Sequence, residues 1–200
     1  MKRLFMHLAL LVLATIASYT QSPTSTSPRG PGEVLKQFCE MDAKGVRLTP
    51  QGWRKAAALF VRPEPPSPGK IVVIKDFVIS PPKIEGNRAE FYVEYVYLGR
   101  LNASAARFLS PSFPLPPDPS KVRAEYSLLL ADKDHKPNTN GSVEHQETGS
   151  SEWRIEGHQP EQHITVDTAI QYVTQIRDKT ADPVIRKNAN KTLATLKRYH

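Results

Sequence analysis

The amino-acid sequence predicts an α+β domain in which two helices come first, a run of antiparallel strands follows, and two further helices close the chain. Three observations carry this prediction. Apolar residues recur with helical spacing between residues 32 and 60. From residue 70 to 157 the pattern changes to β-branched and alternating residues, which is typical of strands. Helical spacing returns after residue 165, and helices segregated from strands favour an antiparallel sheet.

The segment before residue 32 is predicted to lie outside the domain. Residues 1–18 resemble a secretory signal, because Lys2 and Arg3 precede an apolar run and small residues follow it. The run holds about 14 residues, fewer than the roughly 20 that span a bilayer. We therefore expect an exported protein, periplasmic or secreted, with no membrane span after cleavage; an uncleaved anchor is the alternative. Residues 19–31 are rich in Ser, Thr and Pro, and are predicted to be a disordered leader.

The two leading helices carry their apolar residues on one side. In residues 32–44 the apolar positions follow the spacing of a half-buried helix: Val34, Leu35, Phe38, Cys39 and Met41. The second helix has a strong start signal, because Thr49 is a good cap and Pro50 occupies the first helical position. Cys39 is the one cysteine of the chain, so no intramolecular disulfide forms. It is interpreted as a small buried hydrophobe, with a reactive thiol as the alternative.

Four strands are predicted between the helical segments. They cover residues 70–80, 88–98, 121–133 and 151–158, and a turn at 85–87 joins the first two. The proline-rich stretch 101–120 and the polar stretch 134–151 are predicted to be loops. The α+β domain is therefore placed at residues 32–164.

Residues 165–200 are predicted to be a C-terminal helical extension, with a final helix that opens at Asp182-Pro183. The chain has a formal net charge of +7, and loss of Lys2 and Arg3 with the signal leaves +5. Residues 167–200 hold seven basic and three acidic side chains, so most of the excess lies there. A solvated helix face explains this excess, and an exported protein rarely meets nucleic acid, which we therefore exclude as a partner. Binding of an acidic cell-envelope polymer through residues 177–198 is the alternative.

The order of elements and several apolar residues resemble a known family. The residues are Val34, Leu35 and Phe38 on the first helix, Trp53 and Phe60 on the second, the strand AEFYVEYVYLG, and Trp153-Arg154-Ile155. Together they resemble the nuclear-transport-factor-two-like superfamily, with its SnoaL-like and ketosteroid-isomerase-like branches. The resemblance implies a curved antiparallel sheet that forms a cone, with the two N-terminal helices packed on it. The long loop at 101–120 and the C-terminal helices depart from that family.

A ligand pocket is one use of such a sheet. Alternation in the strand 88–98 places Phe91, Val93, Tyr95 and Tyr97 on one face, which should point inward. Tyrosine offers an apolar body and one polar group, which suits a pocket for a small apolar ligand and equally suits a plain core. The candidate pocket residues are Trp53, Phe91, Tyr95, Tyr97, Tyr126 and Trp153.

Acid–base chemistry has weaker candidates. Glu90 and Glu94 share the outward face and lie roughly 13 Å apart at strand rise, farther than the 9.5 Å or so that paired glycosidase carboxylates tolerate. The resemblance implies that the outer face forms a dimer contact, so a homodimer through this face is one prediction, and an ordinary solvated sheet face is the alternative. Asp76 lies on an apolar side of its strand with Val72 and Ile74, and is a weak candidate for a catalytic base.

The sequence HQPEQH at 158–163 is the remaining cluster. His158, Glu161 and His163 are spaced across a proline, unlike the helical spacing of zinc ligands, and are interpreted as a polar loop. GxSxG, HExxH, P-loop and dinucleotide-binding patterns do not occur. We therefore predict no metal, no cofactor and no catalytic machinery. The expected function is an exported module that binds a small ligand or another protein, with a cavity isomerase or dehydratase, or a polymer binder, as alternatives.

Overall fold

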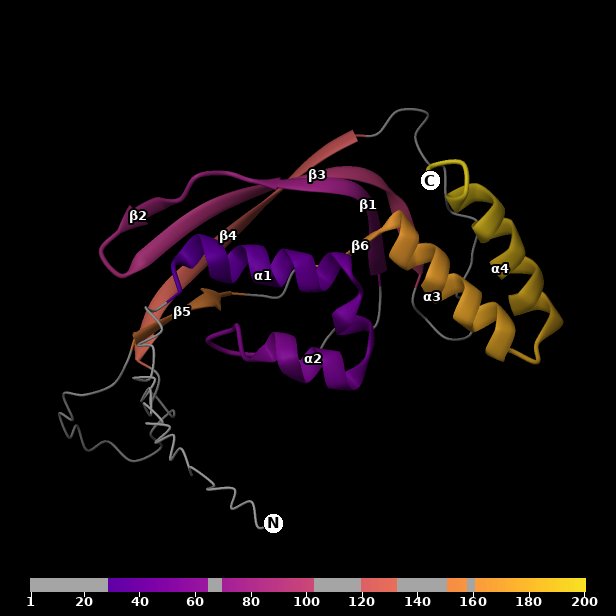
Figure 1. Cartoon of the computed structure of the whole chain (residues 1–200), viewed down its shortest axis with the longest axis horizontal. Helices are drawn as coiled ribbons and strands as arrows, with labels where there is room; N and C mark the ends of the chain where they lie inside the picture. The colour runs from indigo at the N-terminus through magenta and orange to yellow at the C-terminus, as the bar shows by residue number, and fades with distance from the viewer. Residues whose placement is uncertain (1–28, 65–69, 103–119, 133–150, 158–160) are drawn as a thin grey trace, which may run out of the picture.

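The computed structural model describes residues 29–64, 70–102, 120–132, 151–157 and 161–200, so the predicted signal, most of the leader and most of both predicted long loops lie outside the described residues. Within that part the protein is α+β, as predicted. A six-stranded sheet curls into a half-barrel, and four α-helices lie beside it (Figure 1). None of the helices in these ranges has the length and apolarity needed to cross a membrane.

The leading helices begin and end close to where the sequence places them. Helix α1 covers Pro31–Ala43, a 3₁₀ turn η1 covers Val46–Leu48, and helix α2 covers Pro50–Ala57. The hydroxyl of Thr49 accepts a hydrogen bond from the amide of Gly52 at 3.0 Å, which confirms the predicted cap. A Cβ at Gly52 would lie 1.8 Å from the carbonyl oxygen of Val46, so glycine is what allows α2 to approach η1 so closely.

The strands are β1 Lys70–Ile79, β2 Lys83–Glu85, β3 Arg88–Asn102, β4 Ser120–Asp132, β5 Ser151–Glu156 and β6 Gln162–Thr165. Their order across the sheet is β5-β4-β3-β1-β6, with β2 paired to β3. All of these pairs are antiparallel except β1 with β6, which is parallel.

Two expectations about the sheet are therefore wrong. The prediction was an antiparallel sheet, and residues 158–163 were expected in a polar loop; Gln162 and His163 instead begin the parallel edge strand β6. A strand of four residues gives too short a pattern to recognise in the sequence. Strand β3 also runs to Asn102, farther than expected, and pairs with β1 along the added length.

The sheet has a hydrophobic core on each face. On the concave face, α1 and the segment after α2 bury Val72, Phe91, Val93 and Tyr95, among others. On the opposite face, helix α3, Val166–Lys179, and helix α4, Pro183–Leu196, bury a second set: Ile71, Val73, Leu98, Leu101, Ile164, Val166, Ala169, Val173, Ala189, Leu193 and Leu196. Alternate residues of β1 thus serve different cores. The C-terminal helices share a core with the sheet and cover one end of its outer face (Figure 1).

Candidate functional site

The concave face carries a group of polar side chains inside the hydrophobic core. We call it the buried polar cluster, and it consists of Cys39, Asp42, Arg47, Tyr95, Tyr126 and His163. Five elements supply it: α1, η1, β3, β4 and β6. All six side chains belong to buried residues. Such a concentration of buried polar groups is where a functional site is first sought.

An ion pair forms one end of the cluster. Arg47 donates from Nε to Oδ1 of Asp42 and from Nη2 to Oδ2, both at 2.8 Å, and each side chain is 2% exposed. The same Nη2 donates to the backbone carbonyl of Glu161 at 3.2 Å. The guanidinium carbon also lies 5.0 Å from the ring centre of Phe38. Because the pair is bidentate and has further partners, both charges are compensated within the core.

His163 connects this ion pair to the tyrosines. Its backbone amide donates to Oδ2 of Asp42 at 2.8 Å. Its ring stacks on that of Tyr95, with ring centres 3.9 Å apart and planes 7° from parallel. The ring nitrogen Nδ1 lies 3.8 Å from Oδ2 of Asp42, which is too long for a hydrogen bond, and has no hydrogen-bond partner within the described part of the chain.

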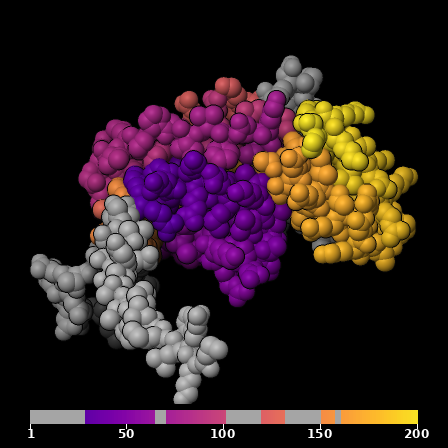
Figure 2. Space-filling view, in the orientation of Figure 1, coloured from indigo at the N-terminus to yellow at the C-terminus, as the bar shows by residue number. Residues whose placement is uncertain are grey.

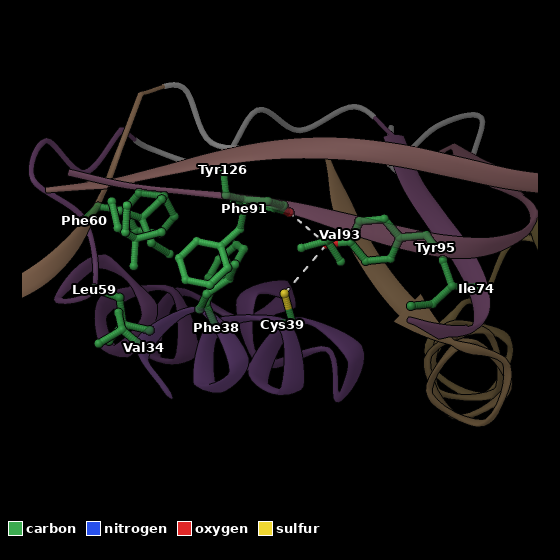
Figure 3. Close-up of a cluster of buried hydrophobic side chains, with 14 of the residues drawn as sticks. Val34, Phe38, Cys39, Leu59, Phe60, Ile74, Phe91, Val93, Tyr95 and Tyr126 are labelled. Atoms are coloured by element: carbon green, nitrogen blue, oxygen red, sulfur yellow. Dashed lines mark hydrogen bonds between the residues drawn. The ribbon is translucent and has the colours of Figure 1, made fainter. Parts of the chain in front are cut away.

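Hydroxyls and a thiol complete the cluster. The hydroxyl oxygens of Tyr95 and Tyr126 lie 2.8 Å apart in a hydrogen bond, and the Cys39 sulfur lies 3.8 Å from that of Tyr95. Figure 3 shows Cys39 pointing from α1 toward the two tyrosines. Burial raises the pKa of the Cys39 thiol to about 12. Burial also raises the pKa of both tyrosines above their ordinary value. All three groups therefore stay protonated at neutral pH, and none is prepared to act as a base or a nucleophile.

The structure brings most of the predicted pocket residues together. Phe91, Tyr95 and Tyr126 are buried in the concave-face core, and Tyr97 and Trp153 pack against it with part of their surface exposed. Trp53 is half-buried on α2, and its ring centre lies 6.5 Å from that of Phe60. Phe38 fills the space beneath Tyr126, with ring centres 6.0 Å apart (Figure 3). Around Phe38 and Tyr126 the inward side chains pack on one another.

Alternation in the sequence predicts that Asp76 shares a face with Val72 and Ile74. The structure shows that it does not. An irregularity in the pairing of β1 with β3 falls between Ile74 and Phe77, and Asp76 lies inside it. The residue is exposed, and its carboxylate accepts a hydrogen bond from the backbone amide of Phe77 at 2.8 Å. The bulge thus places this carboxylate in solvent and outside the core.

The two glutamates of β3 lie on the outer face, where alternation places them. Glu90 is exposed, and Glu94 accepts a hydrogen bond from Nζ of Lys121 at 2.6 Å. That hydrogen bond holds the pKa of Glu94 below its ordinary value. The HQPEQH cluster is separated: His163 is buried, Glu161 is exposed and pairs with Arg100 at 3.0 Å, and His158 lies outside the described residues. The described residues contain no group of acidic, His or Cys side chains that could hold a metal.

Two members of the buried polar cluster, Asp42 and Arg47, were not identified from the sequence, and His163 was assigned to a polar loop. For Asp42 a signal exists. Leu35, Phe38 and Cys39 define an apolar stripe, and the next position with the same spacing is residue 42, so an aspartate there required a buried partner. Arg47 comes five residues later and is that partner. His163 depends on the strand β6, which the sequence pattern does not reveal.

Comparison of the chain with protein-family models, curated proteins and solved structures found no match. The functional argument therefore relies on the geometry of this chain.

Proposed function

We propose that the protein is an exported interaction module. It binds a partner through its surface, and the side chains of its interior do not take part in catalysis. One observation carries the proposal. The tyrosine hydroxyls and the thiol on the concave face are hydrogen-bonded to one another or close together, and burial raises the pKa of all three. The polar groups that a cavity enzyme would present to a substrate are engaged in the core.

Membership of the nuclear-transport-factor-two-like superfamily, and the cone shape of its sheet, belong to this proposal. They are supported by the curl of the sheet and by α1 lying under its concave face (Figure 1). Export is likewise proposed, from the charged, apolar and small residues of 1–18.

The partner surface is the outer face of the sheet, where α3 and α4 leave it uncovered. Two apolar side chains are prominent there: Val78 is 63% exposed and Tyr92 is 44% exposed. The pairing of β2 to β5 places five basic and six acidic side chains on the same face: Lys83, Arg88, Lys121, Arg123 and Arg154, with Glu85, Glu90, Glu94, Glu125, Glu152 and Glu156. Exposed apolar residues among balanced charges are typical of a non-obligate interface.

The partner that this face fits is a second copy of the chain. The charges of the face nearly cancel, with one negative charge in excess, so two copies repel each other little when the faces meet. Several of these charges also form ion pairs within the face, such as Arg88 with Glu156 at 2.8 Å and Lys121 with Glu94 at 2.6 Å. The guanidinium carbon of Arg123 lies 5.1 Å from the ring centre of Tyr92, which holds that ring in place. A held aromatic ring loses little entropy on binding.

Binding of a small apolar ligand is a second candidate function. It is favoured by apolar side chains that are partly exposed at the end of the concave face, beyond the buried polar cluster. Val122 lies opposite Tyr95 on this face and is 44% exposed. Phe77 and Tyr97 are half-buried beside it. These side chains would contact a ligand at the rim of the core. The enzyme alternative needs a titratable group there, and its candidate Asp76 lies in solvent.

Sedimentation velocity of the purified chain tests the proposal. We expect a dimer that dissociates in the Tyr92→Lys variant, since loss of a central aromatic anchor typically costs about 2 kcal/mol or more, roughly a 30-fold weaker Kd. Val184→Lys is the matched control, because Val184 is an apolar residue exposed on α4, away from this face. The proposal would be overturned by a wild-type chain that stays monomeric at every concentration reached. It would also be overturned if dimerisation weakened equally in both variants.

A further inference from the structure

Helix α4 presents a strongly basic surface that the proposed sheet interface does not use. Five basic side chains are exposed along the helix and the turn that follows it: Arg186, Lys187, Lys191, Lys197 and Arg198. At 3.6 residues per turn they form two adjacent rows, one with residues 186 and 197, the other with 187, 191 and 198. We call this surface the α4 basic face. It spans thirteen residues, roughly 18 Å from the first to the last at the rise of a helix, and lies on the flank of the molecule (Figure 2).

The α4 basic face has no acidic counterpart of its own. The helix and the turn after it, residues 183–198, contain no Asp or Glu. Neighbouring carboxylates have other partners: Asp182 caps the helix by accepting from the amides of Val184 and Ile185, Asp178 pairs with Arg177 at 2.8 Å and also feels the charge of Arg186, and Asp167 lies 3.1 Å from His200. Within the described residues, Lys187, Lys191, Lys197 and Arg198 form no ion pair, and Arg186 donates to the carbonyl of Thr180.

This arrangement is unfavourable for the helix itself. Lys187 and Lys191 are four residues apart, and like charges at that spacing repel. Arg186 and Lys187 also lie near the N-terminus of the helix, where its dipole disfavours positive charge. Helix stability therefore does not explain why these residues are basic, whereas binding of an anion would.

The apolar side of α4 is already occupied, which selects the kind of anion. Ala189, Leu193 and Leu196 are buried in the core with residues of α3 and the sheet. The exposed side offers only Val184 and Ala194 as apolar residues. A helix that binds a membrane inserts its apolar side into the lipid, and α4 has none to spare.

We propose that the α4 basic face binds a linear polyanion, a soluble polymer whose phosphate or sulfate groups lie along the two rows. The site is separate from the sheet face, so the proposal does not depend on the dimer. Its binding is electrostatic and releases the counterions of the polymer. If all five side chains contact anionic groups, Kd rises roughly 100- to 500-fold when salt increases from about 50 to about 200 mM.

The test measures binding of labelled inorganic polyphosphate, with heparin as the sulfated arm, to the purified full chain by fluorescence anisotropy. The variant Lys187→Glu/Lys191→Glu removes two contacts and adds repulsion. We expect its Kd at low salt to rise about tenfold or more. Over the same salt range its Kd should then increase by only roughly 20- to 40-fold. Arg54→Glu/Lys55→Glu is the matched control, because both residues are exposed on α2 and the net charge changes equally.

A second readout separates binding from folding. The α4 variant exchanges one like-charge pair for another and places negative charge near the helix N-terminus and beside Arg186, which is favourable, so its melting temperature without polymer should equal or exceed that of wild type. Polyphosphate binding by the control at the wild-type level supports the proposal. Equal weakening in both variants, absence of binding to both polymers, or tighter binding to vesicles with anionic lipid or to duplex DNA at equal charge concentration would each overturn it.

Discussion

Removal of Arg47 is predicted to destabilise the fold more than any surface change. The variant Arg47→Met keeps much of the side-chain length and removes the charge. It leaves the Asp42 carboxylate buried with one remaining donor among the contacts described above, the amide of His163. It also removes two hydrogen bonds of 2.8 Å to Asp42 and one of 3.2 Å to Glu161.

The expected magnitude follows from burial. Both partners of the ion pair are 2% exposed, and breaking a buried pair by removing one partner costs about 3–5 kcal/mol. That is a large part of the free energy of unfolding of a typical domain, which is about 5–15 kcal/mol. Urea denaturation followed by circular dichroism measures the loss as a lower midpoint at unchanged slope.

The double variant Asp42→Leu/Arg47→Met gives the control. Removing both charges leaves no uncompensated ion in the core, so the double variant should be more stable than Arg47→Met alone by about 2 kcal/mol or more. The pair would not be a structural connection between η1 and α1 if Arg47→Met lowered the free energy of unfolding by less than about 1 kcal/mol. The same holds if the losses of the two single variants simply added up in the double variant.

Three further predictions follow from the core. Above pH 9 the unfolded chain loses thiol and then tyrosine protons, at ordinary pKa values of 9.0 and 10.0, whereas burial keeps Cys39, Tyr95 and Tyr126 protonated in the fold. Stability should therefore fall as pH rises, by about 1.4 kcal/mol per pH unit for each group, seen as a declining urea midpoint; a flat profile from pH 9 to pH 11 or so contradicts it. Cys39 should react with a thiol reagent at the rate of unfolding; labelling at the rate of a free thiol would place it at the surface. Gly52→Ala should lower the melting temperature, because its Cβ would lie 1.8 Å from the Val46 carbonyl oxygen; an unchanged value would show that α2 shifts freely.

The sequence predicts most elements of this fold because their patterns are long. The helices α1, α3 and α4 and the strands β1, β3 and β4 each hold ten residues or more, enough for a period to be recognised. The strand β6 has four residues, and its pairing with β1 joins positions about ninety residues apart in the sequence. Local pattern carries no information about such a pairing, so the parallel edge was missed.

The same limit applies to the candidate site. The inward tyrosines of β3 and β4 follow from alternation, and so does their burial. What they contact depends on where α1 lies, which only the packed structure specifies. The displacement of Asp76 has a similar cause, since a bulge changes which face each later residue of β1 occupies.

The central claim is that the protein binds through the outer sheet face and that its inward tyrosines form a core. The most direct test is the melting temperature as a function of chain concentration, for wild type, Tyr92→Lys and Tyr95→Phe. A dimer is stabilised by mass action, so the account predicts a rise with concentration in wild type and in Tyr95→Phe, and no rise in Tyr92→Lys. A melting temperature that is independent of concentration, but is raised by small apolar compounds only when the Tyr95 hydroxyl is present, would contradict it.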